Sequence, residues 1–109
     1  MSHKNLKSLC DHTTAAHIRI QKDFQYIDPV VSVSQKMRAS GMPVDVLTID
    51  CLKTGKRIIV ILHDHMPDSV SYQFSYKDQD PGDKFEEIPF AKFGEQTIYD
   101  WMKNYFDAK

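Results

Sequence analysis

Two neighbouring apolar runs in the middle of the chain predict a β-hairpin within residues 44–66. The first run, 46–52, alternates apolar and polar residues, as expected for a strand with one buried face. The second run, 57–62, is apolar and mostly β-branched after its first residue, which indicates a strand buried on both faces. Gly55 lies between the runs and accepts the positive φ that a tight reversal requires.

The register of this hairpin has two alternatives, and they place the side chains differently. With a two-residue loop that ends at Gly55, Ile49 shares a face with Ile58, and His63 lies on the other face. With a three-residue loop in which Gly55 forms a bulge, Ile49 shares its face with Ile59 and His63. The environment of His63 therefore depends on the loop.

The residues before the hairpin predict two helices. Apolar side chains recur with a period of about 3.6 residues over 6–27, which is typical of a long amphipathic helix. Asp28 and Pro29 suit the start of a second helix, which would run through Val30, Val33 and Met37 and end before Gly41. The alternative is a short strand over 31–34.

Large side chains occupy every second position of 70–76, which predicts a strand with an aromatic face. Residues 85–90 predict a fourth strand, confined to a sheet edge by Pro89. After Gly94, the spacing of Ile98, Trp101 and Tyr105 predicts a helix that closes the core. We therefore expect a single α+β domain over residues 1–109, a two-layer sandwich of two N-terminal helices, a three- to four-stranded antiparallel meander and a C-terminal helix.

Charge and composition narrow the range of partners. The chain has a net charge of −1, so binding of nucleic acid is unlikely on electrostatic grounds. It contains no run of ~20 apolar residues and no signal-like segment, so we expect a cytoplasmic protein that does not bind membranes. Cys10 and Cys51 match no metal or redox spacing and are expected to be reduced and buried.

His63 and His65 are the residues most suggestive of metal chemistry. They lie two positions apart on a predicted strand, so both rings would point to the same face. A catalytic zinc requires three protein ligands, and no third ligand occurs at a known offset. We therefore predict no catalytic residue, no metal and no cofactor. A metal-dependent or histidine-assisted enzyme that uses His63 and His65 is the alternative function.

The aromatic strand suggests a third function. Tyr72, Phe74 and Tyr76 share one face, as do the base-stacking residues of single-strand binders. The surrounding charge does not support a phosphate-binding surface, so we expect weak nucleic-acid binding at most. A core position beneath the helices is the favoured interpretation of these rings.

The leading hypothesis is a non-enzymatic binding module for a protein partner or a second copy of the chain. Three helices would leave one sheet face uncovered, with Thr48 and Asp50 on it. Tyr99 and Phe106 lie seven residues apart on the flank of the terminal helix, and we expect them to remain partly exposed and to join a homodimer contact. The alternative is that both rings close the core near the strand at 85–90.

Overall fold

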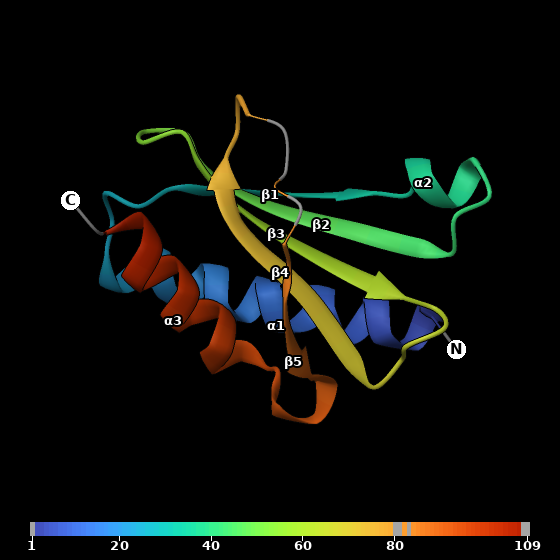
Figure 1. The fold of residues 1–109 in the computed structure, drawn as a ribbon. Helices are drawn as coiled ribbons and strands as arrows, with labels where there is room; N and C mark the ends of the chain where they lie inside the picture. Colours follow the sequence, from blue (N-terminus) through green and yellow to red (C-terminus); the bar gives the residue numbers. More distant parts are fainter. Residues whose placement is uncertain (1, 80–81, 83, 108–109) are drawn as a thin grey trace.

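The computed structural model describes residues 2–79, 82 and 84–107. Its strands form one antiparallel sheet of five strands in the order β1-β2-β3-β4-β5. The elements in chain order are α1 (Ser2–Asp23), β1 (Pro29–Ser34), α2 (Lys36–Ala39), β2 (Val44–Cys51), β3 (Lys56–His63), β4 (Ser69–Tyr76), β5 (Glu86–Pro89), the short 3-10 helix η1 (Phe90–Lys92) and α3 (Glu95–Phe106). Figure 1 shows α1 and α3 side by side on the same face of the sheet.

The α+β class and the antiparallel sheet are confirmed, but the predicted layout is wrong between the first helix and the hairpin. Residues 29–34 form an edge strand, and only the four residues of α2 remain helical. The caps at Asp28 and Pro29 suited a helix, but Asp28 accepts a hydrogen bond from the Gln21 side chain. The β-branched valines favour a strand, and β2 pairs with them along their whole length. The alternative of a short strand is confirmed, although the strand begins at Pro29 and not at residue 31.

The hairpin between β2 and β3 has the face assignment of the two-residue-loop alternative with a longer loop. Cys51 lies opposite Lys56, so four residues form the loop, and Gly55 adopts a φ of 75°. Ile49 lies opposite Ile58, as that alternative requires for a shared face. Neither predicted pairing is correct. The observed register differs by two residues from that of the two-residue-loop alternative, and an offset of two residues preserves the faces. His63 therefore lies on the face away from the helices.

The core lies between the helices and the sheet face that they cover. The side chains buried there come from α1, the central strands and α3; they include Leu9, Ile20, Leu47, Ile49, Ile58, Val60, Ile98 and Met102. The predicted strand at 70–76 and the predicted helix after Gly94 are confirmed as β4 and α3, and the predicted fourth strand is confirmed as the short edge strand β5. Among the described residues, no helix combines the length and apolar character of a membrane span.

Candidate binding surfaces

No helix in the described part of the chain covers the second face of the sheet, and we call this face the open face. Figure 1 shows both long helices on the opposite side. Since neighbouring strand residues alternate between faces, the residues between the core positions point outward here. Thr48 lies opposite Ile59, and Asp50 lies opposite Arg57. The residues of the open face include Val30, Ser32, Val46, Thr48, Asp50, Arg57, Ile59, Ile61, His63 and Gln73. Asp50 and Ile59 are buried among them.

Asp50 and Arg57 form a cross-strand ion pair on the open face. The Nε and Nη2 atoms of Arg57 lie 2.6 and 3.0 Å from the two carboxylate oxygens of Asp50. The hydrogen bond to Asp50 raises the pKa of Arg57, so the guanidinium remains charged. Asp50 is buried, whereas the Arg57 side chain is 27% exposed. Asp50 therefore acts on this surface mainly by orienting Arg57.

The segment after β4 restricts the open face at one side. The Gln73 side chain accepts a hydrogen bond from the backbone N–H of Gly82 at 2.9 Å and donates one to the Lys84 carbonyl at 2.8 Å. Since Gln73 points to the open face, these bonds hold residues 82 and 84 beside it. The accessible part of the open face therefore lies towards β1, β2 and β3.

The edge strand β1 adds exposed apolar side chains next to the open face. Val30, Val31 and Val33 are 42%, 37% and 45% exposed. Val31 and Val33 lie on the helix side of the sheet, opposite Ile49 and Leu47, but α1 does not cover them. The exposed edge was missed at the sequence level because this segment was predicted to be helical. The alternation of Val and Ser, which underlies the short-strand alternative, is the signal that identifies it.

The aromatic residues of β4 lie on the helix-covered face and contact α3. Tyr72 stacks on Trp101 with ring centroids 4.3 Å apart, and Phe74 stacks on Tyr105 at 5.0 Å. Phe74 and Tyr76 nevertheless remain 43% and 42% exposed. A hollow of about 220 Å³ lies beside Phe74, Trp101 and Tyr105. Two of the three predicted stacking rings thus already stack within the molecule.

The two histidines lie at the end of β3 and in the turn that follows. His63 is half-buried and His65 is exposed. Between them, Asp64 accepts two hydrogen bonds of 2.8 Å from Arg38 of α2. Arg38 also binds both carboxylate oxygens of Asp45, at 2.9 and 3.0 Å. Among the side chains that the structure describes, in residues 5–79, 82 and 84–107, no three His, Cys, Asp or Glu are grouped so that they could hold a metal.

The charges around Arg38 have a structural explanation. Asp45 is only 2% exposed, and the hydrogen bonds from Arg38 lower its pKa, against the opposing effect of burial. The ion pairs connect α2 to β2 and to the turn after β3.

Cys10 is unsuited to act as a nucleophile. Burial and the neighbouring Asp11 raise the pKa of its thiol, which disfavours the reactive thiolate.

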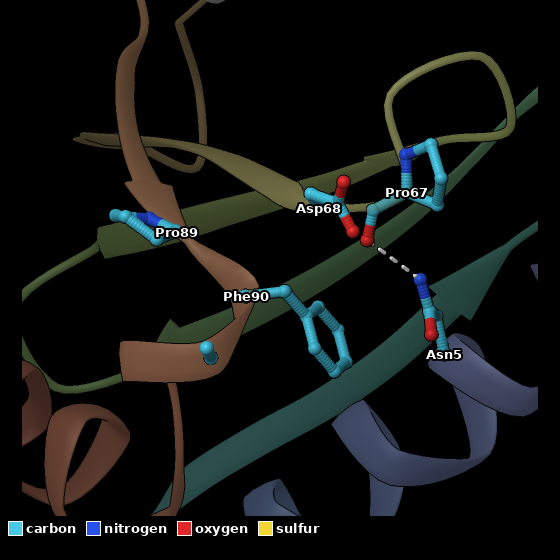
Figure 2. A pocket seen from close by; sticks show the side chains of 6 residues that line it. Asn5, Pro67, Asp68, Pro89 and Phe90 are labelled. Carbon is cyan, nitrogen blue, oxygen red and sulfur yellow. Dashed lines mark hydrogen bonds between the residues drawn. The ribbon is translucent and has the colours of Figure 1, made fainter.

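A hollow of about 420 Å³ lies near the start of α1, where β5 and the turn before β4 meet (Figure 2). The Asn5 side chain donates a hydrogen bond of 3.0 Å to the Pro67 carbonyl across it. Among the lining residues that the structure describes, Asp68 has the one charged side chain, and the Asp68 carbonyl accepts the Phe90 N–H. Prolines, an alanine and a phenylalanine form most of the remaining wall, so the hollow has few polar groups that could bind a ligand or take part in a reaction.

The expected exposure of Tyr99 and Phe106 is wrong. The two residues are only 8% and 4% exposed, because α1 packs against this flank of α3. The Tyr99 hydroxyl donates a hydrogen bond of 2.6 Å to Asp23, and the Arg19 guanidinium lies 4.3 Å from the centre of the Tyr99 ring. Both side chains belong to the hydrophobic core, as the alternative expected, and the contacts of Tyr99 are to α1. Little of either side chain remains for a partner.

Thr48 and Asp50 lie on the uncovered face as expected, and the structure brings them together with Arg57 and the β1 edge. His63 also points to this face, beyond Ile61 on the same strand.

No protein-family model, curated protein or solved structure matches the chain.

Proposed function

We propose that this protein is a small non-enzymatic binding module that takes a protein partner on the open face and along the adjoining edge of β1. The observation that supports this most directly is the one-sided arrangement of α1 and α3, which leaves the open face without a helix over it (Figure 1). Protein partners are the usual occupants of such partly apolar surfaces. The proposal needs no bound cofactor or metal.

The composition of the surface favours a protein over other ligands. Val46 and Ile61 supply a half-buried apolar centre, and Thr48 and Ser32 add hydroxyl groups. Arg57, oriented by Asp50, offers one fixed positive charge of the kind enriched in protein interfaces. A single cation of this kind provides too little charge for a nucleic-acid backbone.

The stacked aromatic rings give less support to the single-strand nucleic-acid hypothesis. Base stacking requires an accessible ring face, and Tyr72 and Phe74 already direct ring faces towards Trp101 and Tyr105. The net charge of −1 also opposes approach of a polyanion. A protein partner on the open face avoids both difficulties.

Site-specific photo-crosslinking tests the proposal. A photoreactive amino acid replaces Thr48 on the open face in one variant and Lys22, which is exposed on α1, in a matched control. We expect a crosslinked protein, which can be a second copy of the chain, from position 48 only, and we expect excess unmodified protein to suppress it. Absence of a crosslink from position 48, or equal labelling from both positions, would contradict the proposed function.

A further inference from the structure

The two edges of the sheet differ in how well they are protected. β5 has four residues, of which two are glutamates and one is a proline. β1 has six residues, contains no charged side chain, and exposes three valines. Natural edge strands usually carry charges, prolines or bulges that block pairing with another strand. Apart from Pro29 at its start, β1 lacks these features and is suited to pairing with another strand.

The direction of the free backbone groups of β1 follows from the pairing of β2. The carbonyls of Pro43 and Cys51 accept hydrogen bonds from Asp64 and Gly55, so odd-numbered residues of β2 direct their polar groups towards β3. The backbone N–H and C=O groups of the even-numbered residues of β2 therefore point towards β1. Their partners are Val30, Ser32 and Ser34, which leaves Val31 and Val33 with outward N–H and C=O groups.

The strand can pair with itself in one favourable register. Antiparallel pairing centred on Ser32 places Val31 opposite Val33 of a second copy, and both residues then exchange their outward N–H and C=O groups. Centring on Val31 would place Val33 opposite Pro29, which has no N–H and whose carbonyl is already 2.8 Å from His17 Nε2. Centring on Val33 would place Val31 opposite Gln35, which lies beyond the strand.

The flanking charges are complementary in that same register. Asp28 precedes β1 and Lys36 follows it, and both are exposed. Both are four positions from Ser32, so Asp28 lies opposite Lys36 of the second copy at both ends of the paired strands. On the helix side, Val31 and Val33 of the two copies would adjoin one another. They would also adjoin a hollow of about 340 Å³ between α1 and β1, which Thr13, His17 and Val31 help to line.

We infer that the chain forms a two-fold symmetric homodimer by antiparallel pairing of β1 with β1 of a second copy, centred on Ser32. The two five-stranded sheets become one continuous sheet, and the open faces of both copies lie on the same side. This inference rests on the proposed function and names a second copy of the chain as the partner along the β1 edge.

Cysteine crosslinking of the full chain tests the register. Ser32 would form a non-hydrogen-bonded pair with its own copy, with Cα atoms about 4.5 Å apart, inside the range of roughly 4.4 to 6.8 Å that a disulfide spans. Ser32→Cys should give a covalent dimer on mild oxidation. The control Ser34→Cys places the two thiols about 13 Å apart along the strands and should remain monomeric on a non-reducing gel, as should the wild-type chain.

Sedimentation equilibrium of the non-oxidised protein tests the interface independently. Val31→Pro removes an outward N–H without breaking a bond to β2, and it should shift the mass to that of a monomer while the circular dichroism spectrum is retained. Asp28→Lys and Lys36→Asp should each raise the dissociation constant about tenfold, since each creates two like-charge contacts. The double variant should recover the affinity of the wild-type chain.

Three results would overturn the inference: a wild-type chain that stays monomeric at millimolar concentration, equal crosslinking of Ser32→Cys and Ser34→Cys, or a dimer that is insensitive to Val31→Pro and to both charge reversals. The proposed function fails separately, through the absence of a specific crosslink from position 48. A monomer that still crosslinks a different protein from that position would thus contradict the homodimer alone.

Discussion

The buried carboxylate of Asp45 is held in its charged form mainly by the guanidinium of Arg38. Asp45 lies on the helix-covered face at the start of β2, where it is almost fully removed from solvent. Arg38 binds both of its oxygens, and Gln35 donates a further hydrogen bond at 3.2 Å. These donors satisfy the carboxylate in its ionised form, which makes protonation unfavourable in the folded chain.

Lowering the pH should therefore destabilise the folded protein, in part because Asp45 becomes protonated. Its folded-state pKa is lowered by Arg38, so the stabilisation is present above the unfolded pKa of about 4 and is lost as the pH falls through the lower folded value. We expect Asp45→Asn to flatten the dependence of the free energy of unfolding on pH between about 2 and 5. Urea denaturation at a series of pH values measures this slope.

The control for that experiment is Asp11→Asn. Asp11 forms an exposed ion pair with Lys7 one helical turn away, and exposed pairs contribute little to stability. Asp11→Asn should leave the slope close to that of the wild-type chain. The same slope in Asp45→Asn and the wild-type chain would show that Arg38 does not stabilise a charged Asp45.

The two histidines at the end of β3 permit a direct test of the alternative enzyme hypothesis. We predict that protein purified without an affinity tag contains no stoichiometric zinc, nickel or iron. The double variant His63→Ala and His65→Ala should then have the same metal content, measured by plasma mass spectrometry. A metal that is present in the wild-type chain and lost in the double variant would support the metal-dependent function instead.

At the scale of elements, local patterns predicted each strand of the central hairpin but not its exact pairing. The alternation in 46–52 and the apolar run in 57–62 depend only on neighbouring residues, and both appear as strands. The loop length depends on how Lys53 and Thr54 fold with Gly55, which the pattern does not specify. The faces were still correctly given by one alternative, because an error of two residues returns each side chain to the same side.

The failure at β1 has a different physical cause. Local capping signals and β-branched valines favoured different structures, and the nearby strand β2 decided between them by pairing with every residue of β1. The burial of Tyr99 was likewise unpredictable from α3 alone, since it depends on Arg19 and Asp23 of α1. Tertiary contacts therefore determined the parts of the candidate site that the sequence pattern missed.

The hairpin loop should be sensitive to a side chain at Gly55. Its φ of 75° is unfavourable for alanine, although no atom lies within 4 Å of an added Cβ, so strain is the only cost. We expect Gly55→Ala to lower the free energy of unfolding by about 1 kcal/mol. Gly55→Asn should lower it less, because asparagine tolerates a left-handed backbone. Equal losses in the two variants, measured by urea denaturation, would argue against strain.

The packing of α3 against α1 predicts a large effect at Phe106. This side chain is 4% exposed, whereas Ile18 on α1 is 62% exposed. Phe106→Ala should lower the free energy of unfolding by about 3 to 4 kcal/mol by leaving a cavity, and Ile18→Ala should change it by less than about 0.5 kcal/mol. If Phe106→Ala instead reduced the mass in solution and left the stability unchanged, the ring would belong to an intermolecular contact.

At the scale of the whole molecule, the sheet is shielded unevenly. Two helices cover one face, the segment after β4 borders the other, and β1 remains accessible along its outer edge. The central strands β2 and β3 are paired on both sides and supply much of the core. Resistance to local opening should therefore fall from the centre of the sheet towards β1.

Amide hydrogen exchange should show this gradient and its dependence on concentration. In dilute protein, the outward amides of Val31 and Val33 should exchange quickly, and the amide of Ile59 in the central strand should exchange slowly. At high concentration, the proposed dimer should slow exchange at Val31 and Val33 and leave Ile59 unchanged. Exchange at Val31 and Val33 that does not vary with concentration would show that these amides stay unpaired.

The contacts between α1 and α3 also affect the order of folding during synthesis. Arg19 pairs with Glu95 at 2.8 Å and Asp23 accepts a hydrogen bond from Tyr99, and each contact joins residues 76 positions apart. A ribosome therefore releases α1 long before the helix that packs beside it. The apolar stripe of α1 must wait for the whole sheet to be translated, and during that interval it is exposed apolar surface, which favours aggregation.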